Sequence, residues 1–321
     1  MERVLTIIIP FHNGEKSLSS VLSSLQKQKN QELVKEIVFI NEASKDNGPE
    51  IVQQFISTTG YKTRSITHDS AIGLAKTYNQ AILETTTEFF ILMHQDVVLE
   101  REDSFTKILE PLQKSSDCVA SYPELTLPLA VWNNYNFWQK CMFARHAGRR
   151  DKSFSGKFDC FNKKLLLEKI GQYDEKTFRT AGEDADLAIR IEKASLKIIP
   201  TQVRAIHWHC NDERFSRSAW VRKEAQLSEA YGALVRKNGL PETKFLLLFF
   251  RPALVFGLAI PWFRGFALLL TLLYSFLYTK LVFTTQWRDR RVLVLPFFNF
   301  YLLFVGTFYA IKGFVTGRQK L

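Results

Sequence analysis

Short apolar runs alternate with segments of helical period along the first hundred residues. The apolar runs are rich in β-branched and aromatic residues, as is typical of buried parallel strands; they cover 6–10, 36–40, 62–68 and 88–93. Between them, apolar side chains recur at the spacing of one helix face, which predicts helices over 17–28, from about residue 50, and over 74–83. Repeated β–α units of this length predict an α/β fold with a parallel, doubly wound sheet.

The pattern becomes irregular and aromatic over 118–164. Aromatic residues are interspersed with basic residues there; the aromatics include Trp132, Tyr135, Phe137, Trp138, Phe143, Phe154 and Phe158. Two interpretations remain open, an insertion that faces the substrate or a layer that covers the sheet. Beyond this stretch, the pattern predicts helices over 165–170 and 186–194 and a short strand over 197–200.

Three apolar stretches follow one another near the end of the chain. The first, 245–263, is interrupted by Arg251-Pro252 and Pro261, whereas 265–283 contains one charge and 292–311 contains none. Because a bilayer span needs ~20 apolar residues, the last two are candidate transmembrane segments, and the first is predicted to be an interfacial helix. A two-span hairpin would carry three arginines to the outer side, against the positive-inside tendency. Either the first stretch also spans the bilayer, or these helices are monotopic and never cross it; we favour a shallow or hairpin association with the membrane.

The charge of the chain is concentrated in the same region. Residues 245–321 hold nine basic residues and one acid, Asp289, and so account for +8 of the net charge of +11. Cations that flank apolar segments fit anionic lipid better than nucleic acid, which would require them on a polar face. We expect a catalytic domain over 1–244 and a membrane-associated helical region over 245–321, with no nucleic-acid partner.

Cysteine usage and the first residues bear on the compartment. Four widely spaced cysteines without a CxxC pair argue against a zinc ribbon and against a disulfide scaffold. Residues 1–5 lead directly into the first predicted strand, with no apolar signal core before it. We therefore expect a cell-membrane protein whose catalytic domain lies on the cytoplasmic side.

Polar clusters follow the predicted strands. They are Asn41-Glu42, His94-Gln95-Asp96, the acidic run Glu183-Asp184-Ala185-Asp186, and His207. In open α/β sheets, ligands bind at the carboxyl ends of the strands. Carboxylates at these positions in a basic chain predict a site that binds a metal-chelated phosphate and removes a proton.

Several motifs occur together in a recognisable order over about residues 4–210. They read TIIIPFHN (6–13), EIVFINEAS (36–44), GLAKTYN (73–79), LMHQD (92–96), and GQYDE (171–175) followed by GEDADL (182–187). This series resembles the family 2 glycosyltransferases. The resemblance implies a GT-A fold, which is Rossmann-like, and a nucleotide-sugar donor.

The resemblance also implies a metal site. Asp96 stands where the family's metal-binding aspartate would be, and His207 is favoured as a ligand of the metal or the diphosphate. A carboxylate at a strand end is able to hold Mn²⁺ or Mg²⁺ together with diphosphate oxygens. His94 occupies the position of the family's first aspartate, which shifts the preference modestly toward Mn²⁺.

The remaining motif residues are expected to bind the donor. This set comprises Pro10, His12, Asn13, Asn41, Glu42, Lys76, Asn79 and Gln95. Glu42 replaces an aspartate whose role would be to bind the nucleobase or ribose, so the nucleotide preference stays open. An equally plausible reading has Ser44 and Asp46 capping the next helix.

Asp184 is the candidate general base, with Glu183 beside it as a second catalytic residue. Like-charge repulsion from Glu183 and Asp186 is expected to raise the pKa of Asp184 toward working pH. The alternative is structural, because acids in a first helical turn stabilise the helix dipole, each by ~0.3–1 kcal/mol.

These features predict a metal-dependent, inverting glycosyltransferase at a membrane. It would pass a sugar from a nucleotide-diphosphate donor to a lipid-linked or cell-envelope glycan acceptor. Two alternatives remain, a polyprenyl-phosphate sugar transferase and a non-catalytic, nucleotide-binding membrane scaffold.

Overall fold

A computed structural model describes residues 3–208, 214–239 and 246–321. The chain forms two compact units. Unit 1 comprises Met1–Pro128, Gly148–Glu175 and Glu183–Cys210, and unit 2 comprises Leu129–Ala147, Lys176–Gly182 and Asn211–Leu321. The expected domain boundary after residue 244 lies outside the described residues and stays a prediction.

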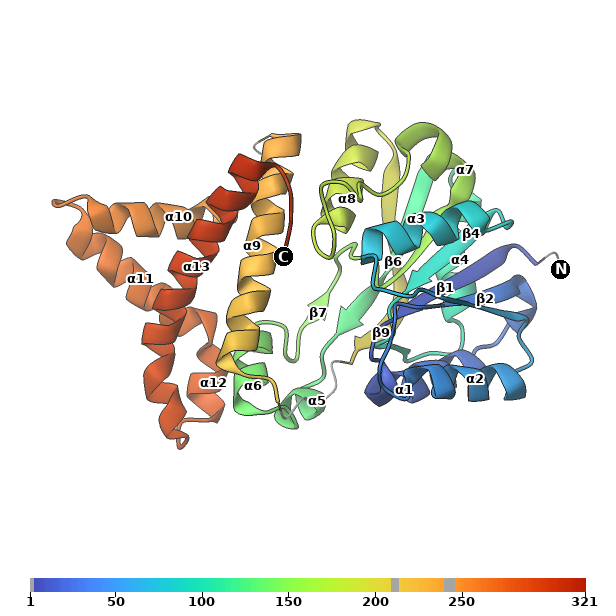
Figure 1. The fold of residues 1–321 in the computed structure, drawn as a ribbon, viewed down its shortest axis with the longest axis horizontal. Helices are drawn as coiled ribbons and strands as arrows, with labels where there is room; N and C mark the ends of the chain where they lie inside the picture. Colours follow the sequence, from blue (N-terminus) through green and yellow to red (C-terminus); the bar gives the residue numbers. More distant parts are fainter. Residues whose placement is uncertain (1–2, 209–213, 240–245) are drawn as a thin grey trace. The chain divides into compact units, whose positions relative to one another are not determined.

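Unit 1 contains a nine-stranded sheet (Figure 1). Its strands are β1 (Leu5–Phe11), β2 (Val34–Asn41), β3 (Thr63–Thr67), β4 (Phe89–Met93), β5 (Val97–Leu99), β6 (Cys118–Thr126), β7 (Arg150–Asp151), β8 (Phe158–Asn162) and β9 (Lys197–His207). The spatial order is β3-β2-β1-β4-β8-β6-β9-β5, with β7 paired to β6. The four strands predicted in the first hundred residues are thus confirmed.

The sheet is mixed rather than parallel throughout. Strands β1 to β4 pair in parallel, as predicted. Strand β8, however, runs antiparallel to both β4 and β6, and β5 runs antiparallel to β9. The predicted parallel arrangement concerns the first hundred residues. The later part of the sheet is mixed, because β8 follows the irregular 127–157 segment instead of a β–α unit. Strand β9 also runs to His207, well beyond the predicted 197–200.

Helices cover both faces of this sheet (Figure 1). Apolar side chains of α1 (Glu15–Gln26), α2 (Gly48–Thr58) and α4 (Ser104–Lys114) pack with one face of β1. Those of α3 (Leu74–Glu84) and α8 (Glu183–Lys193) pack on the other face. A 3₁₀ turn at Gln31–Leu33, the short helix α7 (Lys163–Leu165) and a π-helical turn at Leu166–Ile170 complete unit 1. This layering leaves the carboxyl ends of the strands as the edge where a site forms.

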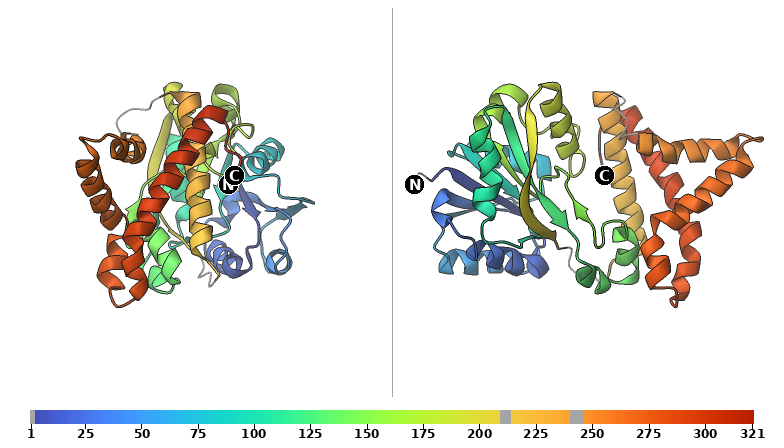
Figure 2. Two further views of the ribbon diagram at one scale, coloured as in Figure 1. Left: turned by 60° about the vertical axis from the view of Figure 1, so that its left-hand side comes forward. Right: turned by 180° about the vertical axis from the view of Figure 1, so that it is seen from behind.

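Unit 2 is helical. Its helices are α5 (Leu129–Asn133), α6 (Phe137–Phe143), α9 (Arg217–Asn238), α10 (Leu246–Ala259), α11 (Arg264–Tyr278), α12 (Lys280–Thr285) and α13 (Leu295–Thr316), with a 3₁₀ turn at Arg290–Val294. The two longest, α9 and α13, lie side by side (Figures 1 and 2). Glycines make this close approach possible: a Cβ on Gly232 would lie 1.9 Å from the carbonyl oxygen of Ala310.

The apolar stretches differ from the expectation in one respect. The stretch 265–283 does not form one helix, since α11 ends at Tyr278 and α12 begins at Lys280. At 1.5 Å per residue, the 15-residue α11 is only about 22 Å long. In the described part of the chain, one helical segment, Arg290–Thr316, is long and apolar enough to cross a bilayer. The candidate transmembrane segment over 265–283 is therefore corrected to two shorter helices.

The aromatic stretch 118–164 is divided between the two units. Its middle part forms α5 and α6 of unit 2, where Trp132 is fully buried and Trp138 packs edge-to-face on Phe298. Its last part forms β8 of unit 1, and Phe154 packs on Phe161 there. The covering-layer interpretation thus describes Phe154, while α5 and α6 belong to the helical unit.

Candidate active site

The predicted metal ligands Asp96 and His207 lie in the turn between β4 and β5 and at the end of β9. His94 and Asp96 follow β4 directly, and His207 is the last residue of β9. Strand β5 follows β4 in the chain and pairs with β9. In this pairing His207 lies opposite Val97, and the backbone N–H of Trp208 donates to the carbonyl of Asp96 at 2.7 Å. This pairing brings together side chains that are far apart in the sequence.

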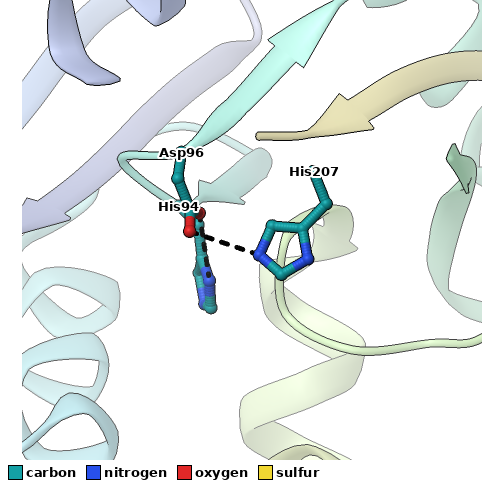
Figure 3. A group of neighbouring side chains, drawn as sticks. All are labelled: His94, Asp96 and His207. Carbon is teal, nitrogen blue, oxygen red and sulfur yellow. Dashed lines mark ion pairs between the residues drawn. The ribbon is translucent and has the colours of Figure 1, made fainter. Parts of the chain in front are cut away.

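The three side chains form one cluster (Figure 3). Nε2 of His207 lies 3.3 Å from Oδ2 of Asp96, and Nδ1 of His94 lies 4.0 Å from Oδ1 of the same carboxylate. One ligand atom from each of the three residues lies within 4.8 Å of the other two. The cluster is partly exposed, so a ligand from solvent has access to it.

The donor set suits a first-row divalent cation. Two imidazole nitrogens and one carboxylate oxygen leave coordination positions for phosphate oxygens and water. Because two of the three ligand atoms are imidazole nitrogens, this donor set favours Mn²⁺ over Mg²⁺, which prefers oxygen ligands. His94 joins the cluster although it replaces an acid, and the metal-binding roles of Asp96 and His207 stay predictions.

Gln95 ties the turn after β1 to the turn after β4. Its side-chain Oε1 accepts from the backbone N–H of His12 at 2.7 Å, and its Nε2 donates to the His12 carbonyl at 3.1 Å. The ring of His12 in turn donates from Nδ1 to the carbonyl of Glu42 at 2.6 Å. The side chain of Asn13 accepts from the N–H of Lys45 at 2.8 Å, and its own N–H donates to Ser44. The turns after β1, β2 and β4 are therefore held together as one surface.

The carboxylate of Glu42 is buried and fully engaged within the protein. It accepts from Nδ1 of His68 at 2.6 Å, from the hydroxyl of Thr77 at 2.5 Å, and from the N–H of Ile72 at 2.9 Å. The side chain of Asn41 is likewise used locally, accepting from the N–H of Ser44 at 2.8 Å. Both residues shape the donor-side loops, and their direct contact with a nucleotide stays a prediction.

The other predicted donor residues differ in exposure. Pro10 is buried within β1, paired with Ile40. Lys76 is exposed on α3. Asn79 is buried, and its amide clamps the GQYDE motif by accepting from the N–H of Tyr173 and donating to its carbonyl, at 2.9 and 3.0 Å. Asn79 thus connects helix α3, which carries predicted donor-binding residues, to the GQYDE motif.

Asp184 lies in the first turn of α8, where burial raises its pKa above the ordinary value for an aspartate. The cation of Lys157 and the backbone N–H of Ala185 oppose this shift. The direction of this shift agrees with the expectation, and burial is its largest cause; the contribution expected from Glu183 and Asp186 stays a prediction. Asp186 is fully buried in an ion pair with Arg190 at 2.9 Å, and Arg190 also donates to the carbonyl of Ile170. Asp186 is therefore part of the scaffold.

Tyr78 shows that the acidic groups converge. Burial raises the pKa of Tyr78, and the carboxylates of Glu183, Asp159, Asp184 and Asp96 raise it further. Asp96, a predicted metal ligand, and Asp184, the predicted base, thus both raise the pKa of the same phenol, that of Tyr78.

The sequence reasoning missed Asp159. This residue lies in β8 with no exposed surface, and burial raises its pKa to about 7. Its Oδ2 accepts from the N–H of Gly156 at 2.6 Å and of Ser155 at 3.1 Å, whereas Oδ1 has no hydrogen-bond partner among the described residues. The sequence feature that could have indicated this residue is an acid within the otherwise apolar run 158–161.

Comparison with known proteins gives a family match for about the first half of the chain. Residues 6–164 match the sequence profile described as Glycosyl transferase family 2. Among curated proteins, a teichoic acid poly(glycerol phosphate) polymerase of Staphylococcus epidermidis is 27% identical over 92 residues. That alignment covers 29% of this chain and 12% of the polymerase, so the similarity concerns a small part of the relative.

Solved structures with the same fold cover more of the chain. A mannosyltransferase from Pyrobaculum calidifontis in complex with GDP-Man and Mn²⁺ aligns with a TM-score of 0.61 and 17% identity, over 96% of this chain and 87% of that one. GalNAc-T7 with UDP, GalNAc and Mn²⁺ aligns with a TM-score of 0.54 and 14% identity, over 72% and 47%. Glucosyl-3-phosphoglycerate synthase from Mycobacterium tuberculosis, with Mn²⁺ and UDP, gives 0.50 and 14%, over 75% and 82%. At these identities the likeness concerns the fold.

Proposed function

Because this chain carries a domain of glycosyl transferase family 2 and has the GT-A fold, we propose that it is an inverting, metal-dependent sugar transferase. The donor is a nucleotide-diphosphate sugar, and the acceptor is a lipid-linked or cell-envelope glycan. One observation carries the proposal: His94, Asp96 and His207 cluster at the strand ends, and the carboxylates of Asp96 and of the partly buried Asp184 both raise the pKa of Tyr78. A cation site and a base for the acceptor are the two groups that such a transfer requires.

Different groups of residues carry out the separate parts of the reaction. The turns tied by Gln95 and Glu42 hold the nucleotide, and the His94, Asp96 and His207 side chains hold Mn²⁺ or Mg²⁺. The bound cation would neutralise the charge of the leaving diphosphate. Asp184 takes the proton from the acceptor hydroxyl while the oxygen of that hydroxyl attacks the anomeric carbon. The bond to the diphosphate breaks on the opposite face, which inverts the configuration.

Unit 2 supplies the reason to place the acceptor at a membrane. Its helices expose many large apolar side chains, with 85% of Trp262 and 76% of Phe297 accessible. Others in α11 and α13 are Phe266, Leu269, Leu273, Tyr301 and Phe308. Contiguous apolar exposure of this kind marks a lipid or protein contact, and the cationic character of 245–321 favours anionic lipid.

The free thiols are consistent with a cytoplasmic catalytic part. Among the described residues, Cys118, Cys141 and Cys160 are unpaired and buried, as is usual in a reducing compartment. We therefore propose action at the cytoplasmic face of the cell membrane.

A panel of UDP-, GDP- and dTDP-sugars tests the enzymatic proposal. The expected result is release of nucleoside diphosphate from one donor class, supported by Mn²⁺ and abolished by a chelator. The Asp184→Asn variant should lose about 10²–10⁴-fold in kcat with little change in donor KM, because it keeps the shape and removes the base. It should also lose the rise in rate with pH that a base of raised pKa produces.

The matched control is Asp117→Asn, which breaks a surface ion pair with Lys197 in the same unit. This variant should retain wild-type kcat. Wild-type turnover in Asp184→Asn would remove the assignment of the base, and metal-independent turnover would remove the cation site.

A further inference from the structure

The exposed apolar face of α11 in unit 2 ends at Tyr278, the last residue of this helix. Between residues 266 and 277, every exposed side chain is apolar; these are Phe266, Leu268, Leu269, Leu272, Leu273, Phe276 and Leu277. The opposite face of the helix, which includes Thr271 and Ser275, is buried. Charged side chains of the same unit gather at the end of the apolar face, around Tyr278.

Arg145 lies on the ring of Tyr278. Its guanidinium carbon is 4.2 Å from the centroid of the ring, and its Nη2 donates to the Tyr278 hydroxyl at 3.2 Å. Arg145 is nevertheless an exposed residue. Because the ring attracts the cation and the hydroxyl fixes one edge of it, the guanidinium is held in one orientation while a ligand from outside has access to it.

A buried ion pair fixes the Tyr278 hydroxyl in turn. This hydroxyl donates to Oε2 of Glu224 at 3.2 Å, and Oε1 of the same carboxylate pairs with Arg251. Glu224 is only 6% exposed. Since Arg251 already balances the charge of Glu224, and no other carboxylate of the described residues pairs with Arg145, this group of side chains keeps a positive charge.

The positive charge lies where the end of an immersed α11 would meet lipid headgroups. The 15 residues of α11 extend over about 22 Å, which is less than the ~30 Å of a hydrocarbon core. Lys280, an exposed residue, adds a second cation just after the helix end. Tyrosine and cationic side chains at the end of an apolar helix are typical of the membrane–water interface.

The chemistry of this helix end fits a phospholipid with a negative headgroup. A guanidinium is planar and presents parallel N–H groups that match two oxygens of a phosphate. The acyl chains of the same molecule would cover the exposed side chains of Leu273 and Leu277, which a soluble anion would leave in water. Charge and apolar surface side by side therefore favour a lipid phosphate over a free one.

We propose that Arg145, held on Tyr278, binds the phosphate of an anionic phospholipid whose acyl chains lie on the exposed face of α11. This inference rests on the proposed function, which places the protein at a membrane, and it names the residue that recognises the lipid. It also gives the buried pair of Glu224 and Arg251 a role, which is to fix the hydroxyl that orients Arg145.

The test titrates the full-length protein in a non-ionic detergent with short-chain phosphatidylglycerol and measures the dissociation constant. Arg145→Gln should weaken binding about 10-fold or more, because it removes a charge-assisted bond to the phosphate. Arg145→Lys keeps the charge but loses the planar fork, and should still weaken binding about threefold or more. The matched control is Arg318→Gln, which removes one exposed charge of the same unit and should weaken binding less than about fivefold.

Two further comparisons separate the headgroup from the tails. Wild type should bind phosphatidylglycerol about fivefold or more tightly than phosphatidylcholine with the same short chains, and Arg145→Gln should lose most of this preference. Tyr278→Phe keeps the ring and every charge but removes the hydroxyl that orients Arg145, so it should weaken binding of phosphatidylglycerol about threefold or more. Glycerol phosphate, which has no tails, should not displace the lipid at equal concentration.

Losses in Arg145→Gln no larger than in Arg318→Gln, or an unchanged preference between the two lipids, would reduce Arg145 to a general charge effect and overturn the proposal. If Arg145→Gln has a lowered melting temperature in detergent, the other two variants decide, and wild-type affinity in both Arg145→Lys and Tyr278→Phe would overturn it. Displacement by glycerol phosphate at equal concentration would assign the site to a soluble phosphate instead. If the wild-type protein bound neither lipid, the proposed membrane contact itself would fail, independently of Arg145.

Discussion

Asp159 illustrates how burial alone sets the chemistry of a side chain. Its pKa of about 7 follows first from desolvation, and the N–H groups of Gly156 and Ser155 offset only part of that effect. A carboxyl group with a pKa raised above its unfolded value binds a proton more tightly in the native state. Between 3.8 and about 7 its contribution to stability therefore falls as pH rises, because the unfolded state releases this proton over that range while the native state still holds it.

Asp159→Asn should remove this dependence on pH. The amide keeps an oxygen for the N–H groups of Gly156 and Ser155 and cannot ionise. Relative to wild type, the variant's free energy of unfolding should therefore rise by roughly 2–3 kcal/mol between pH 5 and pH 8. Denaturant unfolding of both proteins at the two pH values measures the difference. A stability difference that does not change with pH would contradict the raised pKa of Asp159.

The candidate ligands were found by motif and position, whereas the roles of other residues required the folded structure. The order of short motifs pointed to Asp96, His207 and Asp184 before any coordinates. Tyr78 and Asp159 carry no such mark, because a tyrosine in a helix and an acid in a strand gain meaning only from what surrounds them. The engagement of Glu42 with Thr77 likewise depends on the packing of α3 on the sheet.

At the level of elements, the contact between α9 and α13 is set by glycine. A Cβ on Gly232 would lie 1.9 Å from the carbonyl oxygen of Ala310, and one on Gly313 would lie 1.9 Å from the carbonyl oxygen of Glu229. Real side chains do not approach backbone atoms this closely. The two helices therefore pack at their observed distance only while both positions lack a side chain.

Gly232→Ala should force α9 and α13 apart and lower the free energy of unfolding by roughly 1–3 kcal/mol. Gly265→Ala is the matched control, since Gly265 lies in α11 and a Cβ there would meet no atom within 4 Å. Alanine in a helix is favoured over glycine, so this control should leave stability unchanged or raise it slightly. Thermal unfolding of the full chain in detergent distinguishes the two; equal melting temperatures would contradict the close contact.

At the scale of the whole molecule, the described part of unit 2 exposes many large apolar side chains. The segment Arg290–Thr316 is long enough to cross a bilayer, yet 44% of its most apolar window is buried inside the protein. One side of this helix thus packs on α9 while the other side is exposed. Such a helix fits a lipid contact along one face.

Phe297→Glu should weaken binding to vesicles that contain an anionic phospholipid by about 10-fold or more, because burial of a phenylalanine contributes ~1.5–3 kcal/mol. Leu83→Glu is the control, since Leu83 is 59% exposed on α3 of unit 1. Co-sedimentation of each full-length variant measures the affinity. Equal losses in both variants would show a general charge effect, and no loss in Phe297→Glu would exclude this face from the lipid contact.

By itself, the sequence determined the strands and helices of the first hundred residues, the family resemblance and the candidate ligands. These features depend on local hydrophobic period and on residue order, which are written along the chain. Tertiary structure decided the antiparallel insertion of β8, the division of 265–283 into two helices, and burial as the cause of the raised pKa of Asp184. It also decided that His207 meets Asp96 and that Arg145 meets Tyr278, because contacts between distant segments and the loss of solvent around a group exist only once the chain has packed.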